Sequence, residues 1–133
     1  MPQKKCVDVA CAIIYFKDKI LVTQRSETMN LPLKWEFPGG KLEPNESEIN
    51  CIKREILEEI NIKIDVVKKL SDSIFDYGTI QIKLIPFIAN FISGDIILAE
   101  HKEYRLLDIS ELSNLDWAEA DKPIVEELLK TVL

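Results

Sequence analysis

The sequence lacks any long hydrophobic run. No apolar stretch approaches the roughly 20 residues that a membrane-spanning helix needs, so we expect no membrane partner. The first five residues are basic, but Asp8 interrupts the apolar stretch that begins at Cys6, which leaves no core for a signal peptide. The cysteines Cys6, Cys11 and Cys51 are odd in number and have no C-x-x-C spacing, which favours a reduced protein. We therefore expect a cytoplasmic protein.

An excess of positive charge is also missing. The formal net charge is −6, whereas a nucleic-acid polymer is bound through stripes of Lys and Arg, so we expect no such partner. A nucleotide is not excluded, because a bound metal ion reverses the charge locally. The sequence has no repeat, low-complexity tract or linker, and its 133 residues suffice for one well-buried core. We therefore predict a single domain over residues 1–133.

Strand and helix signals follow one another in a way that is typical of the α/β class. Apolar and β-branched runs predict a first hairpin from residues 7–16 and 20–24 and a second hairpin from residues 62–75 and 79–92. A later short strand is predicted at residues 104–107. An extended piece over residues 35–37 should end at Pro38 and the two glycines after it. Helical periodicity predicts a helix over about residues 46–61 and a closing helix over residues 121–132. The core-facing stripe of the first helix is expected to be Ile49, Ile52, Ile56 and Ile60. Strands followed by isolated helices predict a mixed sheet between helices.

The first predicted helix carries an unusual group of acidic residues. At about 100° per residue, Glu55, Glu58 and Glu59 fall on one face. Like charges at these spacings destabilise a helix by roughly 0.2–0.5 kcal/mol per pair, so the cluster gives the protein no advantage unless a cation binds to it. Grouped hard oxygen ligands suit Mg²⁺, which keeps waters or substrate phosphates as its other ligands. The cluster therefore indicates metal-assisted chemistry on a phosphorylated substrate.

These glutamates belong to a longer pattern with fixed spacing. The stretch GGKLEPNESEINCIKREILEEINI reads G-x5-E-x7-R-E-U-x-E-E-x-x-U, where U is apolar. Its six fixed residues are Gly40, Glu46, Arg54, Glu55, Glu58 and Glu59. With an average usage of about 6% for each, six matches arise by chance on the order of once in ten million windows. A solvated acidic helix is the alternative, but it leaves the glycines unexplained.

The pattern resembles the signature of the Nudix hydrolases, which hydrolyse nucleoside diphosphates linked to some other group. The resemblance implies an α/β/α sandwich with a mixed central sheet and a loop–helix–loop that carries the signature. One departure is visible, because the family usually has Gly where this chain has Asn61. Asn is the next most tolerated residue at a left-handed helix C-cap, so we expect the turn to survive.

The resemblance also implies a metal site. The expected cofactor is Mg²⁺, with Mn²⁺ as a substitute. The resemblance implies that the metal ligands include the carboxylates of Glu55, Glu58 and Glu59, which also carry catalysis, and the backbone carbonyl of Gly39. Arg54 is expected to pair with Glu46 and to hold the glycine loop against the helix, which is a structural role.

Further features resemble the MutT-type branch of this family, which removes damaged or unwanted nucleoside triphosphates. The stretch WEFPGGK is similar to that branch's approach to the signature, where an aromatic residue, here Phe37, lines the base pocket and Lys41 lies near phosphate. Glu100 lies where the branch carries a distant glutamate that binds metal or helps to activate water; a plain surface glutamate is the alternative. Arg25 matches a family arginine that touches substrate. The lone His101 is a weak candidate for acid–base chemistry, and a solvated loop histidine is the expectation.

The stretch WAEADKP resembles the part of the branch that precedes the last helix and carries a base-reading Asn or Asp. Asp121 is therefore the candidate for base recognition, although an Asp two residues before Pro123 also suits a helix N-cap. An ionised Asp only accepts hydrogen bonds, so it can accept from the amino group of cytosine or from the N1–H and N2–H₂ of a guanine. A CTP- or dCTP-type nucleotide and an oxidised one such as 8-oxo-dGTP both stay open, and the run from Leu115 to Asp121 is most similar to members labelled CTP pyrophosphohydrolases.

We therefore expect a Mg²⁺-dependent hydrolase that converts a nucleoside triphosphate to monophosphate and pyrophosphate and clears unwanted nucleotides from the pool, a task linked to DNA repair. Two alternatives stay open: hydrolysis of another substrate, such as a sugar nucleotide or dinucleotide polyphosphate, and a nucleotide-sensing domain without catalysis. Sensing modules commonly lose signature glutamates, which are all present here. The family often dimerises, so a homodimer is compatible with the resemblance, but no stretch of the sequence marks an interface.

Overall fold

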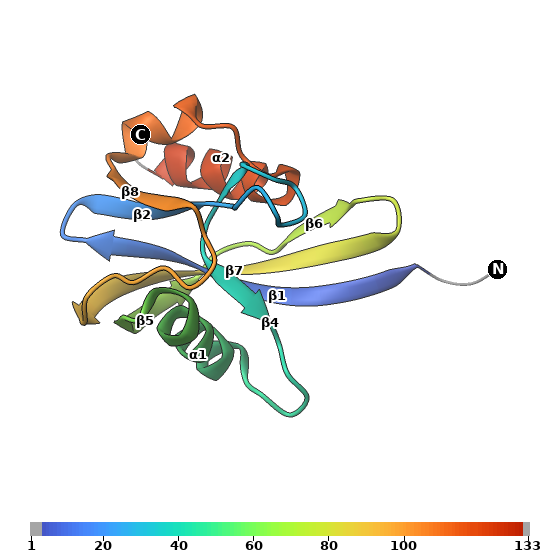
Figure 1. Ribbon diagram of the computed structural model, residues 1–133, viewed down its shortest axis with the longest axis horizontal. Helices are drawn as coiled ribbons and strands as arrows, with labels where there is room; N and C mark the ends of the chain where they lie inside the picture. Colours follow the sequence, from blue (N-terminus) through green and yellow to red (C-terminus); the bar gives the residue numbers. More distant parts are fainter. Residues whose placement is uncertain (1–3, 132–133) are drawn as a thin grey trace.

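The computed structural model describes residues 4–131 as a mixed β-sheet between helices. Figure 1 shows α1 on one side of the sheet and α2, with the short 3-10 helices before it, on the other. The strands are β1 (Lys5–Phe16), β2 (Lys19–Gln24), β3 (Trp35–Glu36), β4 (Gly39–Lys41), β5 (Lys63–Lys69), β6 (Ser73–Asp76), β7 (Ile80–Ser93) and β8 (Glu103–Leu107). The helices are α1 (Glu48–Ile60), η1 (Ile109–Asn114), η2 (Glu119–Asp121) and α2 (Lys122–Thr131). The predicted α/β class and sandwich are confirmed.

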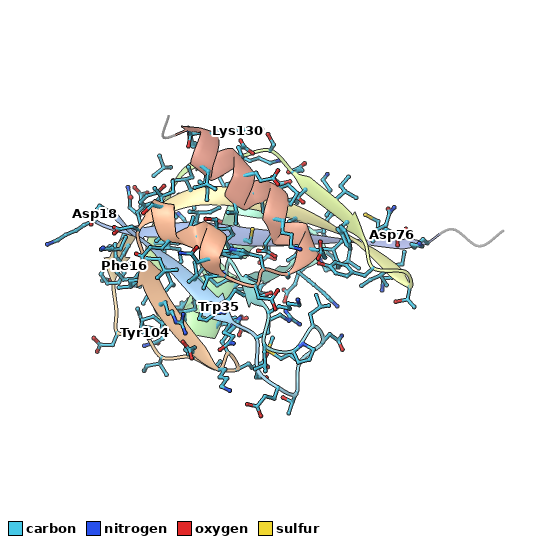
Figure 2. The ribbon with its side chains drawn as sticks, turned by 90° about the horizontal axis from the view of Figure 1, so that it is seen from above. Phe16, Asp18, Trp35, Asp76, Tyr104 and Lys130 are labelled. Carbon is cyan, nitrogen blue, oxygen red and sulfur yellow. The ribbon has the colours of Figure 1, made fainter. Side chains whose placement is uncertain are left out.

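Strands β1 and β7 form the centre of the sheet and run parallel, from Lys5 opposite Ile80 to Tyr15 opposite Asn90. The path across the sheet is β3-β2-β1-β7-β5, with β4 paired to β1, β6 to β7 and β8 to β2. The two hairpins, β1–β2 and β6–β7, are antiparallel and turn at opposite ends of the sheet, as the positions of Asp18 and Asp76 in Figure 2 show. The sheet is therefore mixed, because a parallel central pair is flanked by antiparallel neighbours.

The two faces of the sheet carry separate hydrophobic cores. Alternate residues of a strand point to opposite faces, so Ala10, Ala12 and Ile14 of β1 join the core under α1, whereas Cys11 and Ile13 join the core under α2. The helical side chains buried in these cores are Cys51, Ile52, Ile56 and Ile60 of α1 and Ile124, Val125 and Leu128 of α2. Full burial of one such isoleucine or leucine contributes about 1.5–3 kcal/mol, so these contacts hold both helices on the sheet.

Helix α1 has a cap at each end. The Ser47 side chain accepts a hydrogen bond from the Asn50 amide at 3.1 Å, which satisfies one of the unpaired N–H groups of the first turn. Asn61 lies at φ 67° in the left-handed region, and its N–H donates to the Leu57 carbonyl at 3.0 Å. The prediction that Asn61 replaces the usual glycine at this turn is confirmed.

Three details differ from the sequence-based expectations. Ile49 is 46% exposed, because the first turn of α1 lies beside the edge strand β5, where Ile49 shares a surface groove with Val67; Cys51 is buried instead. The run 62–75 forms two strands, because Pro86 of the facing strand has no N–H to donate to a continuous ladder. The glycines after Pro38 do not end the extended segment but form β4 against β1.

Helix α2 closes the second face of the sheet as predicted, with Leu129 only partly buried at its rim. The predicted end of this helix at Val132 lies outside the described residues. Over residues 4–131, no helix is long and apolar enough to cross a membrane.

Substitutions at Asn61 test the left-handed end of α1. Asn61→Ala should lower the free energy of unfolding by about 1 kcal/mol, because Ala tolerates a positive φ poorly. Asn61→Gly should stay within about 0.5 kcal/mol of the wild type, because Gly adopts this conformation readily. Urea unfolding of the three proteins provides the comparison, and equal stabilities of the Ala and Gly variants would contradict the proposed cap.

Candidate active site

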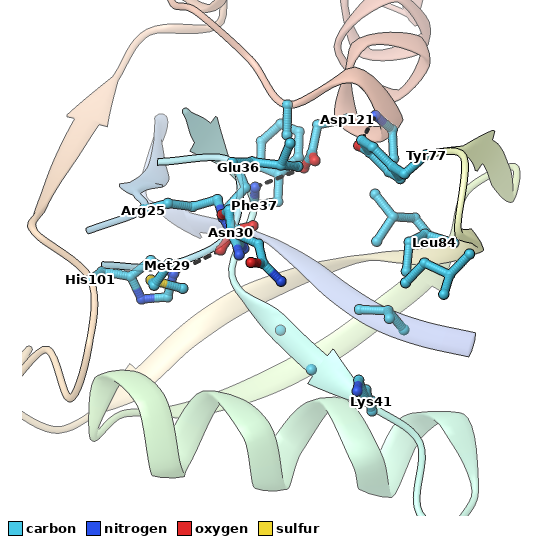
Figure 3. Close-up of a pocket in the computed structure, with 18 of the residues that line it drawn as sticks. Arg25, Met29, Asn30, Glu36, Phe37, Lys41, Tyr77, Leu84, His101 and Asp121 are labelled. Carbon is cyan, nitrogen blue, oxygen red and sulfur yellow. Dashed lines mark hydrogen bonds and ion pairs between the residues drawn. The ribbon is translucent and has the colours of Figure 1, made fainter. Parts of the chain in front are cut away.

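A cavity of about 590 Å³ opens beside the glycine pair (Figure 3). Its walls come from β1, β4, β7, the end of α1, the loop after β2 and the segment before α2. The predicted site residues that line it are Arg25, Phe37, Gly39, Lys41, Glu59, Glu100 and Asp121. Segments that are far apart in the sequence therefore meet around one space.

Glu55 and Glu58 do not line this cavity directly. Arg54 Nη1 donates to Glu55 Oε1 at 2.9 Å and to Glu58 Oε2 at 3.1 Å, so the arginine draws both carboxylates to its own side. The Glu55 carboxylate also packs against Gly40, where a Cβ would collide with it. Within residues 4–131, no three side chains of His, Cys, Asp or Glu lie close enough together to hold a metal ion.

The predicted pairing of Arg54 with Glu46 is confirmed. Arg54 donates through Nε to Glu46 Oε2 at 2.6 Å and through Nη2 to Glu46 Oε1 at 2.9 Å, a bidentate arrangement. This hydrogen bonding lowers the pKa of Glu46 to about 2, mainly because Arg54 stabilises the ionised form. Glu46 also accepts from the Glu43 amide at 3.1 Å, so the pair ties the loop before α1 to the middle of the helix.

The acidic end of the cavity favours a bound cation. Burial raises the pKa of Glu59, and the neighbouring Glu100 carboxylate raises it further. Burial also raises the pKa of Glu55, against the opposing effect of Arg54. Carboxylates that lose solvation and repel each other are stabilised by a nearby positive ion, and carboxylate and carbonyl oxygens are the donors that a hard divalent ion prefers. The donor chemistry of these residues therefore fits such an ion.

The opposite end of the cavity contains a buried carboxyl group. Asp121 is 4% exposed, and the Phe37 amide donates to its Oδ2 at 3.0 Å. Burial, and secondly the Glu36 charge, raise the pKa of Asp121 well above its ordinary value. Asp121 therefore accepts its hydrogen bond from the residue that follows β3, and not from the helix that begins beside it, as an N-cap would. The protonated form, which can donate as well as accept, is therefore more accessible than an ordinary Asp would allow.

The residues of the cavity that sequence reasoning missed include Glu36 and Tyr77. Glu36 accepts from Arg25 Nη1 at 2.9 Å and lies 2.8 Å from His101 Nε2. Tyr77 accepts a hydrogen bond from the Ala120 amide at 3.0 Å, which ties the β6–β7 turn to the segment before α2. The opposite charges of Arg25 and Glu36, on either side of the loop 26–34, were the sequence signal that could have identified Glu36. No local pattern links Tyr77 to Ala120, which lies 43 positions away in the sequence.

The histidine expectation was wrong. The His101 side chain is only 3% exposed and pairs with Glu36, so it is not a solvated loop residue. The two tryptophans lie behind the cavity wall: Trp35 and Trp117 are buried in the core, and the Trp117 ring lies 4.8 Å from that of Phe37. Phe37 therefore presents a supported aromatic face to the cavity.

Asp121→Asn should increase stability near neutral pH. Because burial raises its pKa, the folded protein keeps the Asp121 proton at pH values at which the unfolded chain has already released it. The contribution of Asp121 to stability is therefore complete below the pKa that it has in the unfolded chain, and it declines as the pH rises toward its pKa in the folded protein. Asn does not titrate and still accepts a hydrogen bond from the Phe37 amide.

Thermal unfolding between about pH 4.5 and about pH 8 measures this difference, which should grow with pH in favour of the variant. Asp65→Asn, at an exposed position of β5, is the control. A difference that stays constant across this range would show that the Asp121 carboxyl does not carry a raised pKa.

Comparisons with known proteins show which family the chain is similar to. The model of the NUDIX domain matches residues 4–128. The CTP pyrophosphohydrolase of Escherichia coli is 30% identical over 125 residues, covering 94% of this chain and 93% of that protein. The 8-oxo-dGTP diphosphatase of Buchnera aphidicola (subsp. Schizaphis graminum) is 28% identical over 128 residues, covering 96% and 97%.

Solved structures show the same similarity. The solution structure of the DNA mismatch repair protein MutT, a Nudix hydrolase from methicillin-resistant Staphylococcus aureus, is 40% identical with a TM-score of 0.79, covering 97% of this chain and 99% of that one. Nudix hydrolases generally use divalent metal ions. The chain therefore belongs to the Nudix family, in its MutT-type branch, and is a hydrolase of phosphorus-containing acid anhydrides.

Proposed function

We propose that this protein is a Mg²⁺-dependent pyrophosphohydrolase that converts a nucleoside or deoxynucleoside triphosphate to the monophosphate and pyrophosphate. The observation that carries the proposal is the single cavity with two unlike ends, an acidic end at Glu59 and Glu100 and a buried, partly apolar end at Asp121. Lys41 and Arg25 also line the cavity and add positive charge that can bind a phosphate chain. A nucleotide matches this arrangement, because its phosphates can bind a metal ion at the acidic end while its flat base lies at the partly apolar end.

The proposed ligands of the divalent ion are the three α1 glutamates, Glu100 and the Gly39 carbonyl. When bound, the ion neutralises charge on the phosphates and lowers the pKa of a bound water molecule. The residues of the chain have separate tasks: Arg25 and Lys41 bind the phosphate chain, and Glu100 assists at the attacking water. Glu46 and Arg54 keep the glycine pair against α1.

The base end favours a nucleobase that can match the Asp121 carboxyl group. One of its oxygens is held by the Phe37 amide, so the other is the group that we expect to meet the base. An ionised carboxyl accepts from the amino group of cytosine, and a protonated one can also donate to a carbonyl such as those of an oxidised guanine. The names of the relatives, a CTP pyrophosphohydrolase and an 8-oxo-dGTP diphosphatase, support the same two substrate types. Clearing such nucleotides from the pool is the proposed role.

Glu59→Gln should lower kcat by about two orders of magnitude or more, because the amide removes a charged ligand while it preserves the shape of the side chain. The fold should persist, since Glu59 lies on the cavity side of α1 and not in the core. Release of pyrophosphate from the preferred triphosphate, with Mg²⁺ present, measures the effect. Glu126→Gln, at an exposed position of α2, is the matched control. Wild-type turnover in the Glu59 variant would contradict the metal assignment.

A substrate panel tests the proposed reaction itself. CTP, dCTP, 5-methyl-dCTP, 8-oxo-dGTP and dGTP are compared by kcat/KM with Mg²⁺, and a sugar nucleotide and a dinucleotide polyphosphate complete the panel. We expect one of the cytosine or oxidised-guanine triphosphates to lead, with pyrophosphate as product and with activity lost when a chelator removes the metal ion. A preference for the sugar nucleotide or the dinucleotide would overturn the proposed substrate class, and no hydrolysis of any compound would favour a sensing role.

A further inference from the structure

The single histidine of the chain is buried at the wall of the cavity. Its Nε2 lies 2.8 Å from Glu36 Oε2, and the other oxygen of that carboxylate accepts from Arg25 Nη1 at 2.9 Å. A carboxylate paired with an arginine is acceptor-only, so the hydrogen in the contact with His101 belongs to Nε2. His101, Glu36 and Arg25 thus form one chain of hydrogen bonds, which Figure 3 shows along one side of the cavity.

This chain of hydrogen bonds ends at a guanidinium group with an unused edge. Arg25 Nη1 is held by Glu36, and its Nε donates to the Asn30 carbonyl at 2.5 Å. Among the hydrogen bonds of residues 4–131, none involves Nη2, and Arg25 lines the cavity. Two fixed donors orient the plane of the guanidinium, so the direction of the remaining edge is set by Glu36 together with the Asn30 carbonyl.

The backbone around the histidine is fixed on both sides. The Ala99 amide donates to the Glu59 carbonyl at 3.0 Å, and the Lys102 amide donates to the Gln24 carbonyl at 2.9 Å. His101 therefore lies on a short segment tied to the end of α1 and to the end of β2. Its ring reaches Glu36 from a rigid base, which is what a positioning contact requires.

Burial of this ring carries a cost that packing does not explain. His101 Nδ1 is buried and has no hydrogen-bond partner among the described residues. An unsatisfied buried polar atom opposes folding, so an apolar residue would serve the core better at this position. What the histidine provides instead is a hydrogen-bond donor, Nε2, within 2.8 Å of the Glu36 carboxylate.

We propose that His101 is a positioning residue, which holds Glu36 in one conformation so that Arg25 presents its Nη2 edge to the phosphate chain of the substrate. The inference rests on the proposed function, since it takes the ligand to be a nucleoside triphosphate. Without the Nε2 donor, one oxygen of the partly buried Glu36 side chain loses its partner, and the carboxylate rotates to find another. Arg25 then loses its fixed direction and binds phosphate less well, whereas the glutamates at the metal end are not displaced.

Two amide variants separate this role from simple packing. The terminal nitrogen of Gln lies near the position of histidine Nε2, whereas that of Asn lies near Nδ1, so only His101→Gln can reach Glu36. With the preferred triphosphate, His101→Asn should raise KM about tenfold and leave kcat within about twofold, and His101→Gln should recover most of the loss. Thermal unfolding of each variant shows that it is folded before its kinetics are compared.

A double-mutant cycle tests the link to Arg25. In an Arg25→Ala background, His101→Asn should raise KM by less than about twofold, because the group through which it acts is gone. If the two substitutions raise KM by factors that multiply in the double variant, the proposal is overturned. Equal losses in the His101→Gln and His101→Asn variants, or a fall in kcat at unchanged KM, would also overturn it. Failure to hydrolyse any triphosphate by the wild-type protein would overturn the proposed function instead, so the two failures are distinguishable.

An observation without turnover completes the test. Because the sequence contains one histidine and three arginines, their side-chain nitrogen signals are simple to assign by NMR. The wild-type protein should show the tautomer with hydrogen on Nε2 and an Arg25 Nε–H that exchanges slowly with solvent, and His101→Asn should speed that exchange. Hydrogen on Nδ1 with Nε2 unprotonated would contradict the contact with Glu36.

Discussion

The close packing of the two glycines between β1 and α1 is the constraint on which the site depends. A Cβ at Gly39 would collide with the Ala10 carbonyl of β1, and one at Gly40 would collide with the Glu55 carboxylate of α1. With no side chain at either position, the short strand β4 fits into the gap and the helix lies directly against it. The acidic face of α1 is thereby held at the edge of the sheet, where the cavity opens.

Negative charge gathered at one place requires compensation, and two arginines supply it in different ways. Arg54 binds Glu46 with two donors and also contacts Glu55 and Glu58, so it stabilises the loop and the helix without a metal ion. Arg25 lines the cavity and is held by Glu36, and its Nη2 takes part in no hydrogen bond among residues 4–131. Arg54 therefore stabilises the acidic helix, whereas Arg25 lies at the cavity, where its positive charge can pair with a negatively charged ligand.

Much of the fold could be predicted from the sequence, because its signals are local. The period of α1, its cap at Ser47 and the left-handed turn at Asn61 each depend on a few neighbouring residues. The exposed Ile49 and the interruption opposite Pro86 depended instead on where the sheet ends and which strands meet, which no single segment specifies. In the site, the fixed spacing of the signature identified the acidic helix, whereas the contact between His101 and Glu36, 65 positions apart, had no pattern that could reveal it.

The two ends of the cavity are assembled differently from the sequence, and this affects how substrate specificity can change. The proposed metal ligands come mostly from the continuous stretch 39–59, with Glu100 added from the segment after β7. The proposed base end instead joins the residue after β3, the β6–β7 turn and the segment before α2, through the contacts of Phe37 with Asp121 and of Tyr77 with Ala120. Substitutions at the proposed base end should therefore alter base preference without disturbing the glutamates. That independence is incomplete, because Phe37 lies two residues before Gly39, and its amide is the donor that holds Asp121. A shift of the Asp121 carboxyl group would act on the backbone that leads into the glycine pair, so the proposed base recognition and the proposed metal site are joined through the segment from Phe37 to β4.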